Sequence, residues 1–472
     1  MHCTRHLLVG GVVLGALALQ PSNAGDRFVA LQLTHPNPTG SATTVHQRGY
    51  IDLDNAFFKS LGTNGRTCDS CHRPEDGWSV TPASLQRRFD ATAGLDPIFA
   101  LNDGSNSPMA DVSTIESRRG AFSMLLSKGL IRVGLPIPQQ AEFELQLAND
   151  PYNYASATEL SLFRRPLPAT NLRFASTVMW DGRETVLSAS QKDCIATPLA
   201  CYAPVHVNLG NQANGATVGH AQAAQPLTDE QRIEIVDFEI GLFTAQVRDS
   251  QAGELAPPVA GGGPRVLNEQ EFRVGINDFL VGDFRTGAFD GRVFTLFDAW
   301  KNSDRQSFET DQPKETRRSI ARGEALFNTR TFSIEGVAGL NDVLGKSSVR
   351  GTCSTCHDAP NAGSASVFGT LDIGVSSRSD RTADMPLYVL RNKTTGARIA
   401  TTDPGRALIT GRWSDVNRFK VPTLRALAAR APYFHDGSAA DLAQVIDFYN
   451  RRFQMQLDPD EAADLATFLR VL

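Results

Sequence analysis

The chain has 472 residues, with 46 basic and 51 acidic side chains and a formal net charge of −5. This mildly acidic balance argues against nucleic acid as a partner, because phosphate backbones attract strongly basic surfaces. The length is ample for two domains, each with its own hydrophobic core.

The first 24 residues have the pattern of a secretory signal peptide. Arg5 supplies a positive charge, an uncharged apolar run extends from Leu7 to Leu19, and Ser22-Asn23-Ala24 ends in small residues suited to cleavage. The apolar run is too short to span a bilayer comfortably, although a retained anchor is the alternative. No later segment is apolar enough to span a membrane. We therefore expect an exported, soluble chain that begins at Gly25, with 45 basic against 51 acidic residues and a net charge of −6.

Two C-x-x-C-H motifs follow, at Cys68-Asp69-Ser70-Cys71-His72 and at Cys353-Ser354-Thr355-Cys356-His357. This is the attachment pattern of c-type haem: two thiols add to the vinyl groups of one porphyrin, and the next histidine binds the iron. A C-x-x-C pair alone also fits a zinc half-site or a thioredoxin-type redox pair. The histidine after each motif, and the lack of a visible α/β pattern, favour two covalently bound haem c groups.

The segment between the first motif and residue 250 holds an insertion and two further cysteines. Residues 80–170 are rich in proline and glycine, which predicts loops with short helices. Cys194 and Cys201 flank a short loop that a disulfide closes in an oxidising compartment, with two free buried thiols as the alternative. Haem attachment also takes place outside the bacterial cytoplasm, so both features predict the periplasm. His206 and His220 are either redox-gated haem ligands or surface loop histidines.

The two halves of the chain repeat the same order of elements. Leu172-Arg173 precedes Met179-Trp180-Asp181-Gly182-Arg183, and Leu424-Arg425 precedes Phe434-His435-Asp436-Gly437-Ser438. Each half then closes with a capped amphipathic helix, from Thr228 through Phe243 and from Pro459 towards Leu472. This order indicates a tandem duplication.

Sustained strand alternation is scarce, so we predict a mainly α protein. It would consist of two tandem cytochrome c-like domains, each enclosing one covalent c-type haem, with loop-rich insertions. The predicted boundaries are residues 1–24 for the signal peptide, 25–250 for the first domain with its haem at His72, 251–313 for a linker and inserted segment, and 314–472 for the second domain with its haem at His357.

Several motifs resemble the bacterial di-haem cytochrome c peroxidase and MauG-like family. They are Val421-Pro422-Thr423-Leu424-Arg425, Ala431-Pro432-Tyr433-Phe434-His435-Asp436-Gly437-Ser438, Trp180-Asp181-Gly182-Arg183 and Asp403-Pro404-Gly405-Arg406. With both haem motifs, the resemblance covers most of the mature chain apart from the insertions. It implies a periplasmic enzyme with one electron-transfer haem and one haem, usually the N-terminal one, that meets peroxide. A small cytochrome c or cupredoxin would donate the electrons, and an inter-domain calcium ion is a further expectation.

One departure from the family concerns the second haem. A methionine that ligates the electron-transfer haem usually occupies the position of Phe434, whose side chain cannot bind iron. We predict the adjacent His435 as the sixth ligand, because similar rubber-oxidising enzymes use a histidine in this loop. Tyr433 is a further candidate, since MauG-like enzymes use a tyrosinate. The imidazole of His435 could instead only form hydrogen bonds within the loop.

The other departure concerns the first haem. The distal Gln and Glu that assist O–O cleavage in the family's peroxidases are absent, since Val178 and Ser188 stand near their positions. The nearest substitutes are Glu184 and Gln191.

We predict Trp180, which stands where the second repeat has His435, and Glu184 as catalytic residues of the first haem. Met179 aligns with Phe434 and is a candidate sixth ligand of the first haem, with packing against the porphyrin as the alternative.

The sequence thus predicts an oxidoreductase that passes electrons from the second haem to the first, where hydrogen peroxide is reduced. A di-haem electron carrier, with Met179 and His435 saturating both irons, is one alternative. The other is MauG-like or rubber-oxygenase-like oxidation of a larger substrate that docks on the insertions at residues 80–170 and 265–313.

Overall fold

The structure is a computed structural model that describes residues 29–186, 205–271, 276–283, 287–301 and 311–472. The predicted signal peptide lies outside these residues, as do Ser188, Gln191, Cys194 and Cys201. In the described part of the chain, no helix combines the length and the apolar character that crossing a membrane requires.

Both predicted closing helices are confirmed within the described residues. The first helix is capped by reciprocal bonds between Thr228 and Gln231, and the last by reciprocal bonds between Asp458 and Glu461. The first ends two residues earlier than predicted, because a strand begins directly at Leu242. The helices are α1 (Pro82–Thr92), α2 (Ile115–Ala121), α3 (Ser123–Lys128), α5 (Val205–Gly219), α6 (Asp229–Gly241), α7 (Pro264–Glu269), α8 (Asp311–Thr329), α9 (Asn341–Leu344), α10 (Ala407–Thr410), α11 (Leu442–Phe453) and α12 (Pro459–Arg470).

Short antiparallel strands accompany the helices. They are β1 (Val29–Ala30), β2 (Leu33–Asn37), β3 (Gly40–His46), β4 (Ile51–Asp52), β5 (Ile131–Leu135), β6 (Phe143–Asn149), β7 (Leu160–Arg164), β8 (Leu242–Asp249), β9 (Gly253–Glu254), β10 (Phe332–Glu335), β11 (Ser348–Gly351), β12 (Thr370–Leu371), β13 (Leu387–Asn392), β14 (Arg398–Thr401) and β15 (Phe419–Lys420). The largest sheet has the order β2-β3-β8-β9.

The protein is therefore a mixed helical and β structure, and the prediction of a mainly α fold is corrected. The strands escaped the sequence pattern for a physical reason. Every residue of β7 is buried and the first five residues of β8 are buried, so these strands show no alternation of polar and apolar side chains.

The same aromatic arrangement recurs in both halves and positions the two haem motifs. Phe57 lies against Phe238 of α6, with ring centroids 5.2 Å apart, and 6.3 Å from the ring of His72. In the second half, Phe327 of α8 lies 5.8 Å from Phe468 of α12 and 6.2 Å from the ring of His357. A closing helix and an earlier aromatic residue thus hold each motif, as the predicted duplication requires.

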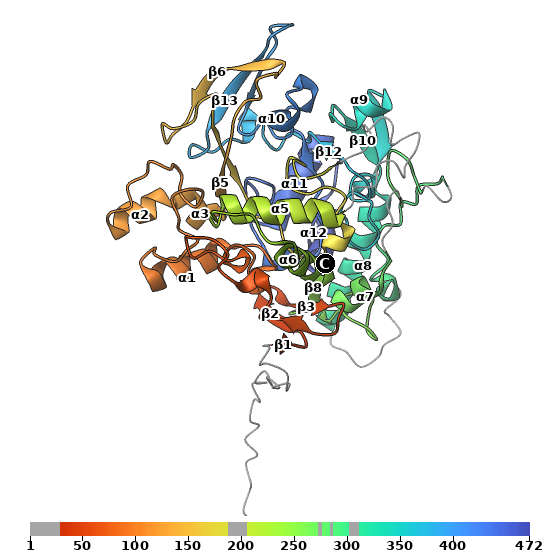
Figure 1. Cartoon of the computed structure of the whole chain (residues 1–472). Helices are drawn as coiled ribbons and strands as arrows, with labels where there is room; N and C mark the ends of the chain where they lie inside the picture. Colours follow the sequence, from red (N-terminus) through yellow and green to blue (C-terminus); the bar gives the residue numbers. More distant parts are fainter. Residues whose placement is uncertain (1–28, 187–204, 272–275, 284–286, 302–310) are drawn as a thin grey trace, which may run out of the picture.

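The first insertion and the second half of the chain join in one sheet. β6 of the first insertion pairs with β13, which in turn pairs with β14, so the sheet order is β14-β13-β6. Residues 80–170 therefore hold strands as well as the predicted short helices. Figure 1 shows β6 and β13 side by side at one end of the molecule and β1, β2 and β3 at the other, with α5, α6 and α12 between them.

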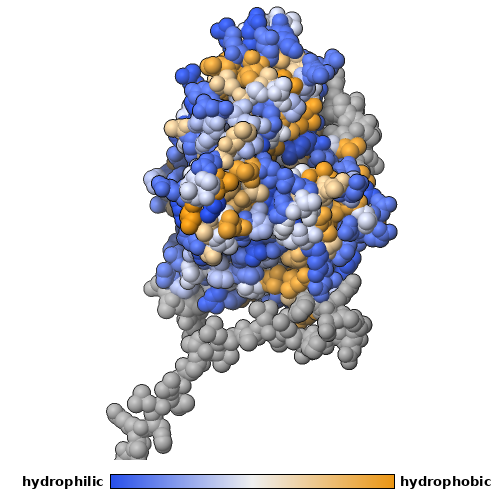
Figure 2. Space-filling model, turned by 60° about the vertical axis from the view of Figure 1, so that its left-hand side comes forward, coloured by the Kyte–Doolittle hydropathy of each residue, from blue (hydrophilic) through white to orange (hydrophobic). Residues whose placement is uncertain are grey.

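The segment 287–301, which we assigned to the linker, packs into the core of the second half. Phe294 lies 5.2 Å from Phe327 and 5.4 Å from Phe468, measured between ring centroids. At the surface, on the face shown in Figure 2, apolar patches alternate with polar side chains, as is usual for a folded protein.

Candidate haem sites

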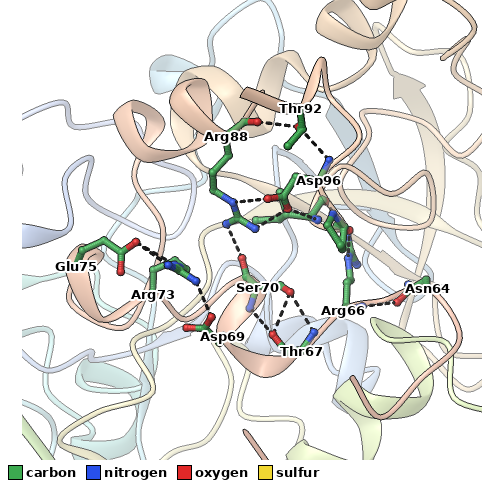
Figure 3. Close-up of polar contacts among 12 residues, drawn as sticks. Asn64, Arg66, Thr67, Asp69, Ser70, Arg73, Glu75, Arg88, Thr92 and Asp96 are labelled. Carbon is green, nitrogen blue, oxygen red and sulfur yellow. Dashed lines mark hydrogen bonds and ion pairs between the residues drawn. The ribbon is translucent and has the colours of Figure 1, made fainter. Parts of the chain in front are cut away.

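The first C-x-x-C-H motif begins in a short 3-10 helix, Cys68–Ser70, which a capping box opens. The backbone N–H of Ser70 donates to Thr67 Oγ1 at 3.1 Å, and that of Thr67 donates to Ser70 Oγ at 3.0 Å. Arg88 of α1 holds the turn from outside: it donates to the carbonyl oxygen of Ser70 at 2.8 Å and forms a bidentate ion pair with Asp96 (Figure 3). Hydrogen bonds of the protein itself thus hold the turn that presents both thiols.

The second motif repeats this geometry. Cys353–Thr355 form a 3-10 helix, and the N–H of Thr352 donates to Thr355 Oγ1 at 2.9 Å. Thr352 and Thr355 stand where the first motif has Thr67 and Ser70, so the same capping logic presents both pairs of thiols.

The two motif histidines are oriented in the same way. The Nδ1–H of His72 donates to the carbonyl oxygen of Trp78 at 3.1 Å, and that of His357 donates to the carbonyl oxygen of Gly363 at 2.6 Å. Each acceptor lies six residues after its histidine, and the bond leaves Nε2 as the atom that can bind a metal. Burial lowers the pKa of both imidazoles to about 4, so both are neutral, as a ligand must be.

Each motif lines a large cavity. The cavity at His72 and the cavity at His357 have nearly equal volumes of about 180 and 190 Å³ and mainly apolar walls. Both cysteines of each motif line the corresponding cavity, and none of the four is in a disulfide. A pair of free thiols, a neutral histidine with one free nitrogen and an apolar cavity are the donor set that a covalently bound haem needs. The residues therefore fit the predicted haem c at each site.

The loops opposite the motifs follow one register. Met179 and Phe434 both adopt left-handed backbone conformations, with φ of 67° and 66°, and Gly182 and Gly437 do so three residues later. A 3-10 helix begins at Leu172 in the first half and at Leu427 in the second. The structure thus confirms that Met179 corresponds to Phe434. The sequence analysis paired Leu172 with Leu424, but in the structure Leu172 corresponds to Leu427.

His435 is placed as a ligand candidate should be. It is only 2% exposed, it lines the second cavity, and neither of its ring nitrogens has a hydrogen-bond partner. The ring stacks on Phe419 at 4.2 Å, and Nε2 lies 3.9 Å from Asp403 Oδ2. Burial lowers its pKa, which keeps the ring neutral.

The neighbours of His435 are less available for ligation. The Tyr433 hydroxyl already donates to the carbonyl oxygen of Leu427 at 3.0 Å. Phe434 packs against Phe448, with ring centroids 4.9 Å apart. Of the three residues, the imidazole of His435 has the donor atoms that the fold leaves unused.

The equivalent loop of the first half presents different side chains. Met179 lines the first cavity. Trp180, which occupies the position of His435, donates from Nε1 to the carbonyl oxygen of Arg165 at 2.8 Å and lines both cavities. Its ring lies 6.2 Å from that of His435. The first cavity is thus lined by the thioether of Met179, whereas the second is lined by the imidazole of His435.

The other predicted residues divide into those at the cavity and those away from it. Glu184 is not among the residues that line the first cavity, so its catalytic role gains no support from the geometry and stays a prediction. His206 is exposed on α5, 4.0 Å from Asp237. His220 lines the first cavity, where its Nδ1 bonds to Asp103, which is also paired with Arg66.

Residues that the sequence reasoning missed also line the first cavity. Arg183 forms an ion pair with Asp181 at 2.8 Å, and Gln212 comes from α5. Glu239 comes from α6, and its signal in the sequence was an acidic residue four positions after the buried Ile235, on the side of the helix that faces the core.

A common wall separates the two cavities. Seven residues line both of them, namely Arg165, Pro166, Leu167, Pro168, Trp180, Lys420 and Thr423. Lys420 donates from Nζ to the carbonyl oxygen of Thr177 at 2.5 Å, and burial lowers its pKa to about 8. The two candidate haem sites are therefore neighbours, one wall of side chains apart.

In the described part of the chain, no group of three or more His, Cys, Asp or Glu side chains is placed to hold a metal ion, so the expected calcium ion stays a prediction.

The curated proteins that this chain matches are cytochrome c peroxidases. It is 42% identical over 69 residues to the cytochrome c551 peroxidase of Nitrosomonas europaea, covering 14% of this chain and 21% of the relative. It is 29% identical over 164 residues to the cytochrome-c peroxidase IdrP1 of Pseudomonas sp. strain SCT, covering 33% and 35%. It is 28% identical over 121 residues to the cytochrome c551 peroxidase of Pseudomonas aeruginosa, covering 25% and 30%. Each match thus spans less than half of the relative's length.

Among solved structures, a MauG-like protein associated with microbial copper homeostasis aligns over 89% of this chain and 88% of its own, at 15% identity and a TM-score of 0.37. A variant of the di-haem peroxidase BthA from Burkholderia thailandensis aligns over 96% and 94%, at 14% identity and a TM-score of 0.29. Neither TM-score is high enough to establish a common fold. No family model matches the chain. The partial matches to the peroxidases, together with the two C-x-x-C-H sites, show that this chain is similar to bacterial cytochrome c peroxidases.

Proposed function

We propose that this protein is a periplasmic di-haem peroxidase in which the haem at His357 receives electrons and the haem at His72 meets hydrogen peroxide. The observation that carries the proposal is the difference between the two ligand loops. His435 offers a buried, unpartnered imidazole to the second cavity, whereas the first half has Trp180 at that position, with its only donor already bonded. An iron that reacts with oxidant needs a vacant or displaceable sixth position, while a relay iron works best with two strong ligands.

The common wall supports electron transfer between the sites. Trp180 touches both cavities, and its ring approaches His435 edge-on, with an interplanar angle of 67°. When bound, the two haems supply the one-electron transfers and the O–O cleavage of the reaction. Reducing one peroxide to two waters takes two electrons from two molecules of reduced donor, a small cytochrome c or cupredoxin, and two protons.

The side chains at the first cavity favour a peroxidase with an unusual distal side. Val178 is apolar and Glu184 does not line the cavity, so the described residues at these two positions do not supply the proton-transferring Gln and Glu that the resemblance implies. Polar side chains that line the cavity include Arg183, Gln212 and His220. A guanidinium and an amide can donate hydrogen bonds to bound peroxide oxygen and so stabilise charge that develops on it.

A di-haem electron carrier is the second candidate, because Met179 lines the first cavity and a thioether can ligate haem iron. Visible and electron-spin spectra of the half-reduced protein separate the two functions. Low-spin haem at both sites favours the carrier, whereas a high-spin or ligand-accessible first haem favours the peroxidase.

The direct test is peroxide-dependent oxidation of several reduced donors, including a small cytochrome c and a cupredoxin. Turnover with at least one donor supports the proposal, and the absence of turnover with all of them contradicts it.

The variant His435→Ala tests the role of the second haem. Its spectra should show the second haem converted from low to high spin, its electron delivery should be slower, and its cyanide binding at the first haem should stay nearly unchanged. Tyr433→Phe is the matched control, since its hydroxyl is already bonded to Leu427 and its loss should leave the spin state intact. A first haem that is six-coordinate, beside a second haem that binds cyanide freely, would mean that the roles are reversed.

A further inference from the structure

Glu239 is a buried acid at the first cavity that the proposed reaction does not use. It lies near the end of α6, is 5% exposed and lines the cavity together with Ile235, one turn earlier on the same helix. Its Oε2 atom is buried and has no hydrogen-bond partner. An unpartnered carboxyl oxygen in an apolar site is costly for a fold, and such groups occur mainly where a protein uses them.

The second half has no acid at the corresponding position. Phe238 of α6 and Phe468 of α12 pack in the same way on their aromatic partners, which sets the register between the two helices. Ile235 then corresponds to Leu465 and Glu239 to Leu469, and both leucines line the second cavity. The same helix face therefore presents a carboxyl group to one candidate haem and a purely apolar surface to the other.

The elements around Glu239 leave it without a charged partner. Of the elements packed against α6, α5 carries His206, Lys59 follows the 3-10 helix Ala56–Phe58, and the 3-10 helix at Leu172 carries Arg173. The first haem motif carries Cys68, Asp69, Cys71 and His72, and its Cys68 packs against the apolar cluster that includes Ile235 and Phe238. Further charged groups line the cavity, namely Arg66, Asp103, Arg164, Arg165, Arg183, His220 and Lys420, and His46 lies beside Phe238. None of the recorded hydrogen bonds or ion pairs of these described residues goes to Glu239. Burial alone raises the pKa of Glu239, to about 8.

We propose that Glu239 is the proton-binding group of the first haem site, taking up a proton when that haem gains an electron and releasing it when the electron leaves. The inference rests on the haem at His72 that the proposed function requires. Reduction from ferric to ferrous iron removes one positive charge from an apolar site, which makes a nearby carboxylate less favourable and its neutral form more favourable. One electron comes from a one-electron donor and one proton from solvent, so the charge of the site is unchanged.

Spectroelectrochemical titration of the holoprotein between pH 6 and pH 9.5, without peroxide, tests the proposal. The potential of the first haem should fall as pH rises, approaching the slope of about 59 mV per pH unit that one proton per electron gives. The potential of the second haem, next to Leu469, should change much less. Glu239→Gln should flatten the first haem's profile, whereas Glu230→Gln, an exposed acid at the start of the same helix, should leave it unchanged.

An infrared difference spectrum of the reduced against the oxidised wild-type protein is the second measurement, and it needs no variant. Reduction should produce the carbonyl stretch of a protonated carboxylic acid, and this band should be missing in Glu239→Gln. A flat profile in the wild type, or an unchanged slope in Glu239→Gln, would overturn the proposal; the latter would assign the proton to another group, such as a haem propionate or His220. Because neither measurement uses peroxide, a protein that lacks peroxidase turnover still gives a clear answer.

Discussion

Replacing Arg164 with methionine should destabilise the fold strongly at neutral pH and weakly in acid. Arg164, at the end of β7, is 2% exposed and joins two carboxylates that are each fully buried. It forms a bidentate pair with Asp403, with distances of 2.6 and 2.9 Å, and a third bond to Asp181 at 2.5 Å. The three residues tie the first insertion to the loop that carries Trp180 and to the segment beside His435.

The size of the effect follows from what the variant leaves behind. Removing one partner of a buried ion pair typically costs about 3–5 kcal/mol, because the other charge stays buried. Burial acts to raise the pKa of Asp181, but Arg164 and Arg183 outweigh it and lower that pKa from 3.8 to about 2. This shift alone corresponds to about 2 kcal/mol of stability. We expect a total loss of about 3–5 kcal/mol at pH 7.

The pH dependence gives the prediction its sign. A carboxyl group whose folded pKa is depressed stabilises the fold above its unfolded pKa, and that contribution is lost as pH falls through about 4 to 2. In Arg164→Met the buried carboxyls take up protons more readily, so the variant should recover relative to the wild type as the pH falls. The gap between the two proteins should therefore be widest near pH 7 and narrow below pH 4.

Urea unfolding at pH 7 and at pH 3, followed by tryptophan fluorescence, measures this gap. The double variant Arg164→Met with Asp403→Asn should recover part of the loss at pH 7, because Asp403 is the carboxylate that loses its arginine partner, whereas Asp181 keeps Arg183. Equal destabilisation at both pH values, or no recovery in the double variant, would refute the electrostatic explanation and favour lost packing.

Three further predictions follow from the sites. Replacing Cys68 and Cys71 with alanine should leave one covalent haem after acid–acetone extraction, and retention of both would contradict the assignment. Lys420→Met should lower the reduction potentials of both haems by tens of millivolts at pH 6, because it removes a cation between the cavities. The difference should fade above pH 8, where burial has already neutralised the lysine. Lys59 lines only the first cavity, so Lys59→Met should lower the potential of the first haem only, and equal shifts of both haems in Lys59→Met would contradict this control. Thr228→Ala should cost about 1 kcal/mol in urea unfolding by removing the cap of α6, whereas Thr228→Ser should cost much less, and equal losses would show that the hydroxyl is not the stabilising group.

Local patterns predicted the parts of each site that are close together in the sequence. Each C-x-x-C-H motif and the threonine before it carry the chemistry and the turn geometry within six residues, and Thr228 and Asp458 signal the helices that they cap. The correspondence of Met179 with Phe434 was also readable, because the loop motifs share their order and spacing. Such features depend on interactions that a short window of sequence contains.

The rest of the sites depends on contacts between distant segments. The common wall takes Arg165 from the first insertion and Lys420 from a short strand of the second half, and no local pattern brings these two together. β6 pairs with β13 more than two hundred residues later in the chain. Fully buried strands such as β7 lack the alternation that reveals half-exposed ones, which explains why the β content was underestimated.

Because the sheet formed by β6, β13 and β14 takes strands from both halves of the chain, the two halves are not independent modules. A fragment that ends before residue 251 would keep β6 but lose β13, and so would expose a row of backbone N–H and C=O groups from Phe143 to Asn149. An open strand edge of this kind is a template for pairing with other chains. Two haem-binding fragments made separately would therefore tend to self-associate, whereas the same fragments made together could pair β6 with β13.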